Sequence, residues 1–138
     1  METIKIGIFG LGRGKAFFDS LVHCNAEIVA ICDRDDTRRN TVWERLGKTP
    51  TPYSEFDDFI EHKGLDAVVI SNSFHQHTPY TIRCLEKNIH VLCECSSNAT
   101  MAEGVALVRA AEKSKAIFML AENYPYSKYN REIKRICD

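Results

Sequence analysis

The sequence lacks three features that would place it in a specialised class of protein. No apolar run approaches the ~20 residues that span a bilayer, so we expect no membrane partner. The formal net charge is only -1, which gives no electrostatic reason to expect nucleic acid as a partner. There is no internal repeat, low-complexity tract or linker. At 138 residues, 44% of them hydrophobic, the chain is expected to form one domain with its own core.

The six cysteines lack the spacing of a metal or redox site. No C-x-x-C pair occurs, and the spacing of Cys93 and Cys95 has little specificity for zinc. Two residues placed in this way at a strand end point to opposite sides, which disfavours a redox pair. Cys24, Cys32 and Cys84 lie in apolar patterns, where a free thiol behaves as a small hydrophobic group. We therefore expect reduced, mostly buried thiols and no metal site.

The two ends of the chain bear on where the protein is located and on whether the natural chain is longer. A strand pattern begins at Ile4 and leaves no room for a signal peptide before it, so we expect a cytoplasmic protein. The final helical segment, residues 129–138, ends without a cap or a glycine, which indicates that the natural reading frame continues.

Short apolar runs alternate with amphipathic segments along the whole chain. Strands are expected at 4–9, 26–32, 65–70, 89–93 and 116–121, with a very short one near residue 53. Helices are expected at 16–22, 37–46, 54–60, 78–87, 100–113 and 127–138. Because the strands are continuous apolar runs, both faces of the sheet should be covered. The predicted fold is α/β, a doubly wound parallel sheet in three α/β/α layers, over residues 1–138.

Three of the expected helices begin with a capping signal. Ser54 precedes acidic residues and is expected to be an N-cap. Thr78 is followed by Pro79, a residue that suits the first position of a helix. Thr100 and Glu103 have the spacing of a capping box.

The first strand ends in a glycine-rich turn, Gly10-Leu11-Gly12-Arg13-Gly14, that opens directly into a helix. Glycines allow the backbone to turn tightly and to approach a ligand, and the free N–H groups of a helix start favour a phosphate. The pattern alone is weak, because glycines also serve ordinary turns between a strand and a helix.

Asp33 ends the second strand, a little over twenty residues after Gly10. An acidic side chain at this distance can accept hydrogen bonds from an adenosine ribose, and it can equally be a capping aspartate. Together with the glycine turn it favours a dinucleotide site. Asp33 should repel a 2′-phosphate, which favours NAD(H). Arg34 could pair with that phosphate or stack on adenine, so NADP(H) stays open.

Polar residues follow two further strands. His75 and His77 lie in the loop 71–77, where they could contact a cofactor ribose or phosphate or simply be solvated. Glu94 and Cys95 follow the next strand. A carboxylate there could bind a sugar hydroxyl or cap a turn, and the residues alone do not decide between these roles.

Several segments, in the right order, resemble the N-terminal domain of the Gfo/Idh/MocA oxidoreductase family across nearly all 138 residues. They are residues 6–12, 31–34, 66–70 with His77, 90–94 and 121–124. The resemblance implies an NAD(P)-binding Rossmann domain. The cofactor-binding residues that it implies, with those of the strand ends, are Gly10, Leu11, Gly12, Arg13, Gly14, Asp33, Arg34, Ser71, Asn72, Ser73, His77, Glu94, Cys95 and Asn123.

The sequence departs from the family pattern in three ways. The third fingerprint glycine of the family falls at Lys15, one residue after Gly14. The Glu-Lys-Pro motif of the family is Glu94-Cys95-Ser96, so a thiol replaces a lysine that helps to position substrate. Family chains are more than twice as long, and a C-terminal α/β domain holds the substrate and a catalytic histidine. We therefore assign no catalytic residue in this chain and expect it to be monomeric or weakly associating.

Two functions fit these observations. The first is the NAD(P)-binding domain of an oxidoreductase that transfers hydride between a nicotinamide and a sugar, cyclitol or related small molecule, with the isolated domain inactive. The alternative is a non-catalytic nucleotide-binding sensor or regulator on the same fold, which Cys95 favours. The expected partners are the dinucleotide and, in a complete protein, a small-molecule substrate.

Overall fold

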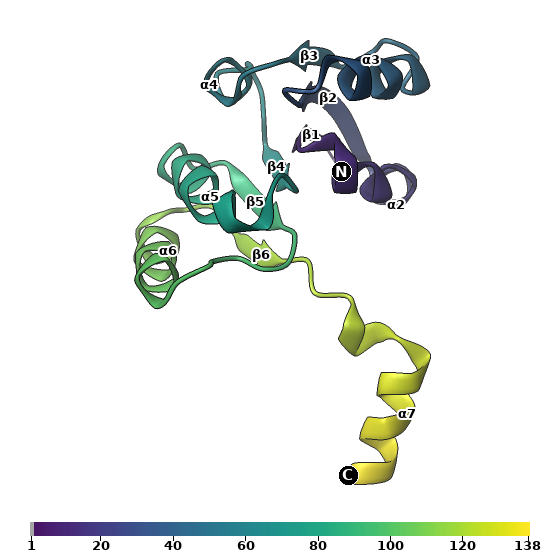
Figure 1. The fold of residues 1–138 in the computed structure, drawn as a ribbon, viewed down its shortest axis with the longest axis vertical. Helices are drawn as coiled ribbons and strands as arrows, with labels where there is room; N and C mark the ends of the chain where they lie inside the picture. The colour runs from purple at the N-terminus through teal and green to yellow at the C-terminus, as the bar shows by residue number, and fades with distance from the viewer. Residues whose placement is uncertain (1) are drawn as a thin grey trace.

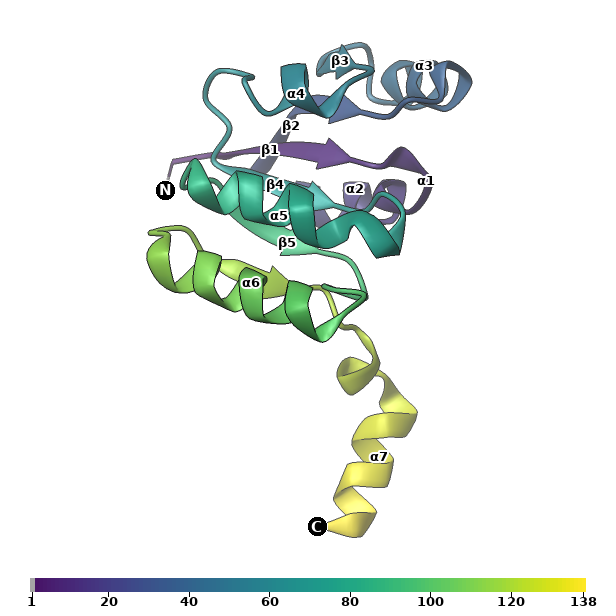
Figure 2. The ribbon, with the colours of Figure 1, turned by 60° about the vertical axis from the view of Figure 1, so that its left-hand side comes forward.

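The computed structural model describes residues 2–138 and shows a parallel sheet with helices on its two faces (Figures 1 and 2). The strands are β1 (Ile4–Phe9), β2 (Ala26–Cys32), β3 (Thr51–Tyr53), β4 (Ala67–Ile70), β5 (His90–Cys93) and β6 (Phe118–Leu120). The helices are α1 (Leu11–Gly14), α2 (Phe18–Val22), α3 (Asp36–Arg45), α4 (Phe56–Phe59), α5 (His77–Glu86), α6 (Met101–Lys113) and α7 (Lys128–Cys137). Single 3₁₀ turns cover Lys15–Phe17, Phe74–Gln76 and Tyr124–Tyr126.

The strand order is β3-β2-β1-β4-β5-β6, and each neighbouring pair is parallel. The chain therefore builds outward from β1 to β3 and then returns to the other side of β1 to continue with β4. Ligands of doubly wound sheets bind where the order reverses, beyond the carboxyl ends of the strands. This switch point lies between β1 and β4. The predicted α/β fold is confirmed.

Both faces of the central strands are buried, as the continuous apolar runs predict. Val68 and Val69 are adjacent in β4 and belong to different core clusters, one on each face of the sheet. The cluster of Val68 contains Phe59 from α4 and Leu85 from α5. The cluster of Val69 contains Phe18 from α2 and residues of α1 and α3. These two clusters hold the three layers together.

The predicted first helix, 16–22, is wrong at its start. Helical structure begins at Leu11, inside the glycine turn, and passes through a 3₁₀ turn before α2 begins at Phe18. Leu11 is fully buried against Ile8 and Val69 in one core cluster. This burial draws the glycine turn itself into a helical conformation.

The capping predictions have mixed outcomes. The capping box is confirmed, because the Thr100 hydroxyl accepts a bond of 3.2 Å from the Glu103 N–H and the Glu103 carboxylate accepts one of 2.9 Å from the Thr100 N–H. Ser54 is not a cap, since α4 begins at Phe56 without a side-chain cap. Thr78 is not a cap either. It lies within α5, and its hydroxyl donates to the carbonyl oxygen of Ser97 at 2.9 Å.

The cysteines divide equally between core and surface. Cys32, Cys84 and Cys93 are buried free thiols, whereas Cys24, Cys95 and Cys137 are exposed free thiols. Burial raises the pKa of Cys32 and of Cys84 to about 12. The prediction of mostly buried thiols is therefore wrong for half of the cysteines, and Cys24, which was placed in an apolar pattern, lies exposed in the turn after α2.

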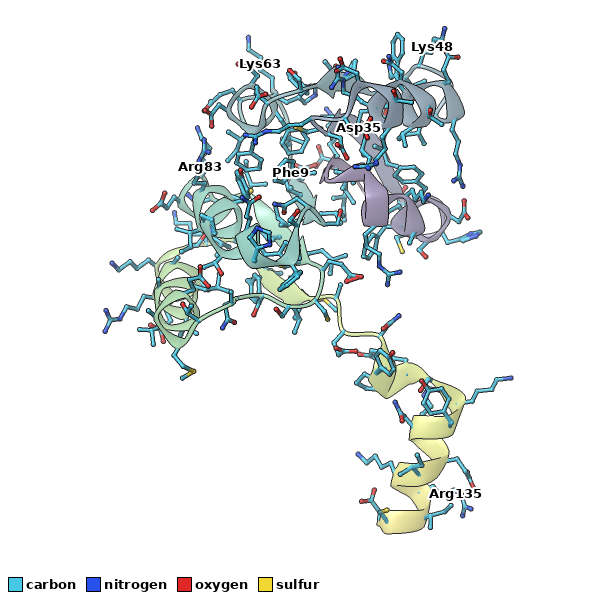
Figure 3. All side chains as sticks on the ribbon, in the orientation of Figure 1. Phe9, Asp35, Lys48, Lys63, Arg83 and Arg135 are labelled. Atoms are coloured by element: carbon cyan, nitrogen blue, oxygen red, sulfur yellow. The ribbon has the colours of Figure 1, made fainter. Side chains whose placement is uncertain are left out.

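The C-terminal helix α7 extends away from the sheet, and its side chains stand clear of the other layers (Figures 1 and 3). Its apolar residues Ile133 and Ile136 are exposed, as is Met119 on the edge strand β6. Within residues 2–138, no helix is long and apolar enough to span a membrane.

The burial of the aromatic core predicts that alanine substitutions at two phenylalanines reduce the free energy of unfolding by very different amounts. Phe59 is fully buried, so Phe59→Ala should reduce the free energy of unfolding by about 3–5 kcal/mol. Phe74 is 60% exposed, and Phe74→Ala should change the free energy of unfolding by less than about 0.5 kcal/mol. Urea unfolding followed by circular dichroism measures both values. Equal losses for the two variants would contradict this assignment of the core.

Candidate functional site

In the glycine turn, residues 10–14, two of the three glycines lie too close to neighbouring atoms for a side chain to fit. Gly10 has a φ of +91°, and a Cβ on it would lie 2.3 Å from the backbone nitrogen of Asn72. Gly14 has helical angles, but a Cβ there would lie 2.6 Å from the hydroxyl oxygen of Ser71. At Gly12 the nearest atom would be 3.9 Å away. The turn therefore lies against the end of β4 at its outer glycines and is open at the middle one.

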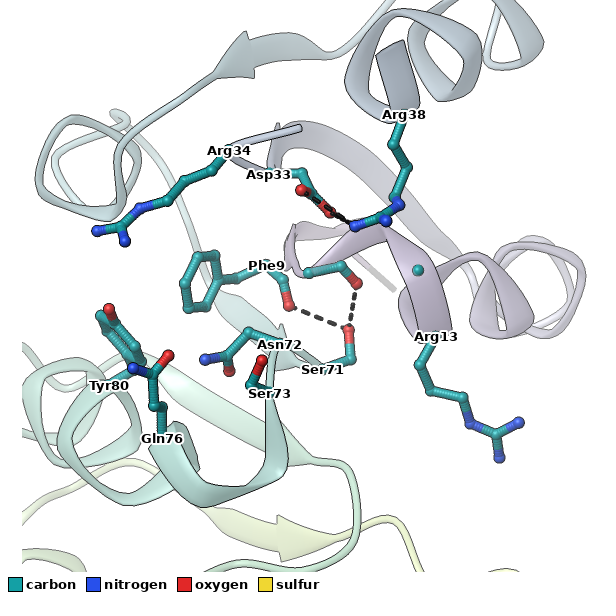
Figure 4. A pocket seen from close by; sticks show the side chains of 12 residues that line it. Phe9, Arg13, Asp33, Arg34, Arg38, Ser71, Asn72, Ser73, Gln76 and Tyr80 are labelled. Atoms are coloured by element: carbon teal, nitrogen blue, oxygen red, sulfur yellow. Dashed lines mark hydrogen bonds and ion pairs between the residues drawn. The ribbon is translucent and has the colours of Figure 1, made fainter. Parts of the chain in front are cut away.

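The side chain of Ser71 joins the end of β4 to this turn. Its hydroxyl donates toward the carbonyl oxygens of Phe9 and Gly10, at 3.0 and 2.8 Å (Figure 4). Its backbone N–H also donates to the carbonyl oxygen of Phe9, at 2.8 Å. Ser71 is buried, so it forms part of the floor of the switch point and holds the two strand ends together.

Asp33, at the end of β2, is a buried carboxylate that faces the glycine turn. Its Oδ2 accepts a hydrogen bond of 2.8 Å from the N–H of Leu11, and its Oδ1 accepts one of 2.9 Å from the N–H of Asp35. The Arg38 guanidinium forms an ion pair with Asp33 at 3.2 Å (Figure 4). These contacts fix the position of the carboxylate at the carboxyl edge of the sheet.

An open pocket of about 430 Å³ lies at the switch point, above the turn and Asp33. Both halves of the sheet contribute to its walls. Its lining residues are Phe9, Gly10, Gly12, Arg13, Asp33, Arg34, Arg38, Ser71, Asn72, Ser73, Gln76 and Tyr80 (Figure 4).

The wall on the β4 side combines an aromatic surface with an amide. The ring of Tyr80 stands edge-on to Phe9, with 4.7 Å between the ring centroids. The side-chain oxygen of Asn72 is buried and has no hydrogen-bond partner among the described residues. Buried polar atoms are usually paired, so this oxygen is suited to accept a hydrogen bond from a molecule in the pocket.

A second group of polar residues lies beyond the glycine turn, at the end of β5. Arg13 Nε donates to Glu94 Oε1 at 2.5 Å, and this carboxylate raises the pKa of Arg13. The other carboxylate oxygen of Glu94 accepts a bond of 2.9 Å from the N–H of Cys95. Glu94 therefore connects the glycine turn to the loop that follows β5.

Cys95 is exposed, and its thiol donates to the carboxylate of Glu122 at 3.2 Å. This hydrogen bond is the main cause that raises the pKa of Cys95 to about 11. The residue is therefore a neutral thiol at physiological pH. It supplies no positive charge at the position where the family pattern has a lysine.

His77 and Asn123 occupy different environments from the other predicted residues. The His77 ring is buried, with Nδ1 2.8 Å from the Ser96 carbonyl oxygen and Nε2 3.1 Å from the Asn72 carbonyl oxygen. The ring therefore joins the loop after β4 to the loop after β5 and does not face the pocket. Asn123 is exposed in the segment after β6.

The structure thus gathers most of the predicted site residues at one edge of the sheet. Leu11 and Gly14 are the buried residues of the glycine turn, and Glu94, which pairs with Arg13 of the turn, also binds the N–H of Cys95. Four further lining residues were not predicted, namely Phe9, Arg38, Gln76 and Tyr80. Arg38 could have been found from its place five residues after Asp33, in the first turn of α3, whereas the other three carry no local signal. No cluster of three or more metal-ligating side chains occurs in the described part of the chain.

A sequence model of an oxidoreductase family with an NAD-binding Rossmann fold, Gfo/Idh/MocA, matches residues 4–122. The chain belongs to this family. In this chain Gly14, one residue before the position of the third glycine in the Gfo/Idh/MocA pattern, packs closely against Ser71 at the end of β4.

Individual relatives include both hydrolases and dehydrogenases. Glycosyl hydrolase family 109 protein 1 of Bacteroides fragilis is 30% identical over 136 residues, which are 91% of this chain and 29% of the relative. Inositol 2-dehydrogenase of Salmonella typhimurium is 26% identical over 140 residues, 99% of this chain and 42% of the relative.

Among solved structures, myo-inositol 2-dehydrogenase from Lactobacillus plantarum superposes with a TM-score of 0.90 and 25% identity. The match covers 99% of this chain and 41% of that one. The chain therefore spans less than half the length of the Gfo/Idh/MocA proteins that it matches.

The geometry of the glycine turn predicts opposite outcomes at two glycines that are two residues apart. Gly10→Ala places a Cβ at positive φ against backbone atoms, so it should reduce the free energy of unfolding by at least about 2 kcal/mol. Gly12→Ala should change the free energy of unfolding by less than about 1 kcal/mol, because a Cβ there would make only ordinary van der Waals contact with the Arg38 guanidinium, at 3.9 Å. Thermal unfolding of both variants measures the difference. Similar melting temperatures would show that the turn does not lie against β4 in this way.

The hydrogen bond between Cys95 and Glu122 predicts an unreactive thiol despite its exposure. With a pKa of about 11, Cys95 should be alkylated by iodoacetamide at pH 7.5 at least ~10-fold more slowly than exposed Cys137. Site-resolved mass spectrometry measures both rates in the same sample. Glu122→Gln should accelerate the reaction of Cys95, and Glu132→Gln on α7 is the matched control that should not. Equal rates for Cys95 and Cys137 in the wild-type chain would contradict the prediction.

Proposed function

We propose that this chain binds NAD(H) at the switch point between β1 and β4 and forms the cofactor half of a dehydrogenase. The observation that carries the proposal is the buried carboxylate of Asp33, held over the glycine turn by the Leu11 N–H at 2.8 Å. A carboxylate in this place can accept hydrogen bonds from both hydroxyls of an adenosine ribose. The family match to an NAD-binding Rossmann fold supports the same conclusion.

The remaining residues of the pocket fit such a cofactor. The N–H groups of Gly12 and Arg13 lie in the first turn of α1, where no intrahelical acceptor exists for them, so they are suited to a pyrophosphate. The nearest atoms to a Cβ on Gly12 would be those of the Arg38 guanidinium, at 3.9 Å, so the backbone there is free of close contacts and can be approached by the phosphates. The unpartnered oxygen of Asn72 offers an acceptor on the β4 side. A bound nicotinamide would supply the hydride chemistry, and the chain would supply its binding and orientation.

The proposed substrate class is a small molecule that carries a hydroxyl group, such as a sugar or cyclitol. The relatives named inositol 2-dehydrogenase support it, and they are also more than twice as long as this chain. A complete protein would therefore need a second, substrate-binding domain, and residues 1–138 alone should bind the cofactor without turnover. The free thiols support a cytoplasmic location for this protein.

A second candidate function is nucleotide sensing without catalysis. Cys95 favours it, because a neutral thiol bonded to Glu122 cannot act as the ammonium group that the resemblance implies at this position. Nicotinamide absorbance with a panel of polyols, measured on the longest natural form of the chain, separates the two functions. Turnover would reject the sensor, and binding without turnover would support it.

The cofactor proposal predicts that the affinity for NAD depends on the carboxylate of Asp33. Isothermal titration of the wild-type chain should show saturable binding of NAD. Asp33→Asn should weaken it at least ~10-fold, because hydrogen bonds to a charged group contribute about 1.5–3 kcal/mol. The matched control is Asp19→Asn, which removes the same charge at an exposed carboxylate that pairs with Arg45 and does not line the pocket. The control should bind NAD within about twofold of the wild type.

Two outcomes would reject the proposal. One is a folded wild-type chain that binds neither NAD nor NADP at millimolar concentration. The other is an equal loss of affinity in Asp33→Asn and Asp19→Asn, which would show that Asp33 has no specific contact with the cofactor.

A further inference from the structure

His77 is the first residue of α5, and its ring lies between two backbone carbonyl groups that come from different loops. Nδ1 is 2.8 Å from the Ser96 carbonyl oxygen, in the loop after β5, and Nε2 is 3.1 Å from the Asn72 carbonyl oxygen, in the loop after β4. The residue is 1% exposed, so water has little access to either contact. Each ring nitrogen therefore faces an acceptor inside the protein.

Only the charged form of the ring satisfies both carbonyl groups. A carbonyl oxygen accepts hydrogen bonds and cannot donate one, and a neutral imidazole carries a single N–H. In the neutral form one ring nitrogen would direct its lone pair at a carbonyl oxygen, whereas an imidazolium donates at both positions. The contact at Nε2 is the longer of the two, so we expect the bond to Asn72 to be the one lost on deprotonation.

The two carbonyl groups are the main stabilisers of a charge on this ring. Among the titratable groups of the two loops, His75 is exposed, and Glu94 is already paired with Arg13. Cys95 is a neutral thiol at physiological pH, and burial raises the pKa of Cys93, at the end of β5, to about 11. The start of α5 adds the positive end of the helix dipole, which opposes a cation. The other ionisable side chains of α5 lie three or more residues further along the helix, namely Tyr80, Arg83 and Glu86.

The bond from His77 bears on the pocket through Asn72. The buried side-chain oxygen of Asn72 is the unpartnered acceptor on the β4 side of the pocket (Figure 4). Because His77 bonds to the backbone of the same residue, it fixes where this acceptor lies. The loop after β5 has a second support, since the Thr78 hydroxyl donates to the Ser97 carbonyl oxygen at 2.9 Å. Loss of the proton should therefore affect Asn72 more than the loop after β5.

We infer that His77 is a positioning residue that, when charged, donates to both carbonyl oxygens and holds Asn72 in place for the cofactor, so that NAD binding takes up a proton. The inference rests on the proposed function and deepens it by adding regulation by pH. The charged ring is present at low pH and is lost as the pH rises, and histidine changes its charge between about pH 5 and 8. The affinity for NAD should therefore fall as the pH rises through this range.

The test is isothermal titration with NAD between about pH 5.5 and 8.5. The wild-type chain should bind NAD about 2- to 10-fold more weakly at the upper end, the factor that corresponds to the net contribution of one hydrogen bond. His77→Gln keeps a donor and carries no charge at any pH, so it should lose this dependence. The matched control is His75→Gln, the same substitution two residues away at an exposed ring that does not line the pocket. It should keep the dependence.

Proton uptake is the readout that a purely structural role of His77 would not change. Titrations near pH 7 in two buffers with different ionisation enthalpies give the number of protons taken up with each NAD. The wild-type chain and His75→Gln should take up a measurable fraction of one proton, and His77→Gln should take up less. If the wild-type chain binds NAD and His77→Gln keeps the wild-type pH profile and proton uptake, the inference is rejected and the cofactor site stands. If the wild-type chain binds neither NAD nor NADP, the proposed function fails and the inference fails with it.

A spectroscopic measurement on the wild-type chain covers the case in which His77→Gln does not fold. Long-range ¹H–¹⁵N spectra of the imidazole rings report whether one or both ring nitrogens carry a proton. Both nitrogens of His77 should be protonated at about pH 5.5, and bound NAD should keep the ring charged to a higher pH than in the free chain. A His77 ring with a single proton throughout the range, with and without NAD, would overturn the inference.

Discussion

The hydrogen bond from the Leu11 N–H to the Asp33 carboxylate is the contact on which the site depends. It joins two strand ends that are separated by 22 positions in the sequence, and it lies in a buried place where water cannot replace it. The bond fixes the carboxylate next to the glycine turn. It also satisfies a helix-start N–H that would otherwise be unpaired. The same carboxylate therefore has a structural role and a proposed binding role.

The opposite wall of the site is built by close approach of the glycine turn to the end of β4, where Gly10 lies against backbone atoms and Gly14 against the side chains of Ser71 and Ile8. Gly10 and Gly14 leave no room for a side chain, and the hydroxyl of Ser71 bridges two carbonyl groups of the turn. Since these contacts involve main-chain atoms, the turn is held with little freedom to adjust. Such a rigid turn presents its remaining N–H groups in a constant direction, which is what recognition of a charged ligand requires.

The sequence predicts those features that depend on local or periodic signals. The alternation of strands and helices, the capping box at Thr100 and the position of Asp33 at a strand end all follow from patterns of this kind, and the first two are confirmed. The early start of the first helix was missed because burial of Leu11 overrides the glycine content of the turn. Tyr80 enters the pocket from α5, a helix packed on the sheet, and no local pattern in the sequence reports which residue of such a helix lines a pocket. The roles of the predicted cofactor residues remain predictions until binding is measured.

The strand order has a mechanical consequence at the pocket. Strands β1 to β3 with their helices lie on one side of the switch point, and β4 to β6 lie on the other, so the pocket is the seam between two halves of the domain. A molecule that contacts Asp33 on one side and Asn72 on the other acts as a noncovalent cross-link across this seam. Its binding energy would add to the cohesion of the whole domain, and the added stability would rise with the logarithm of its concentration.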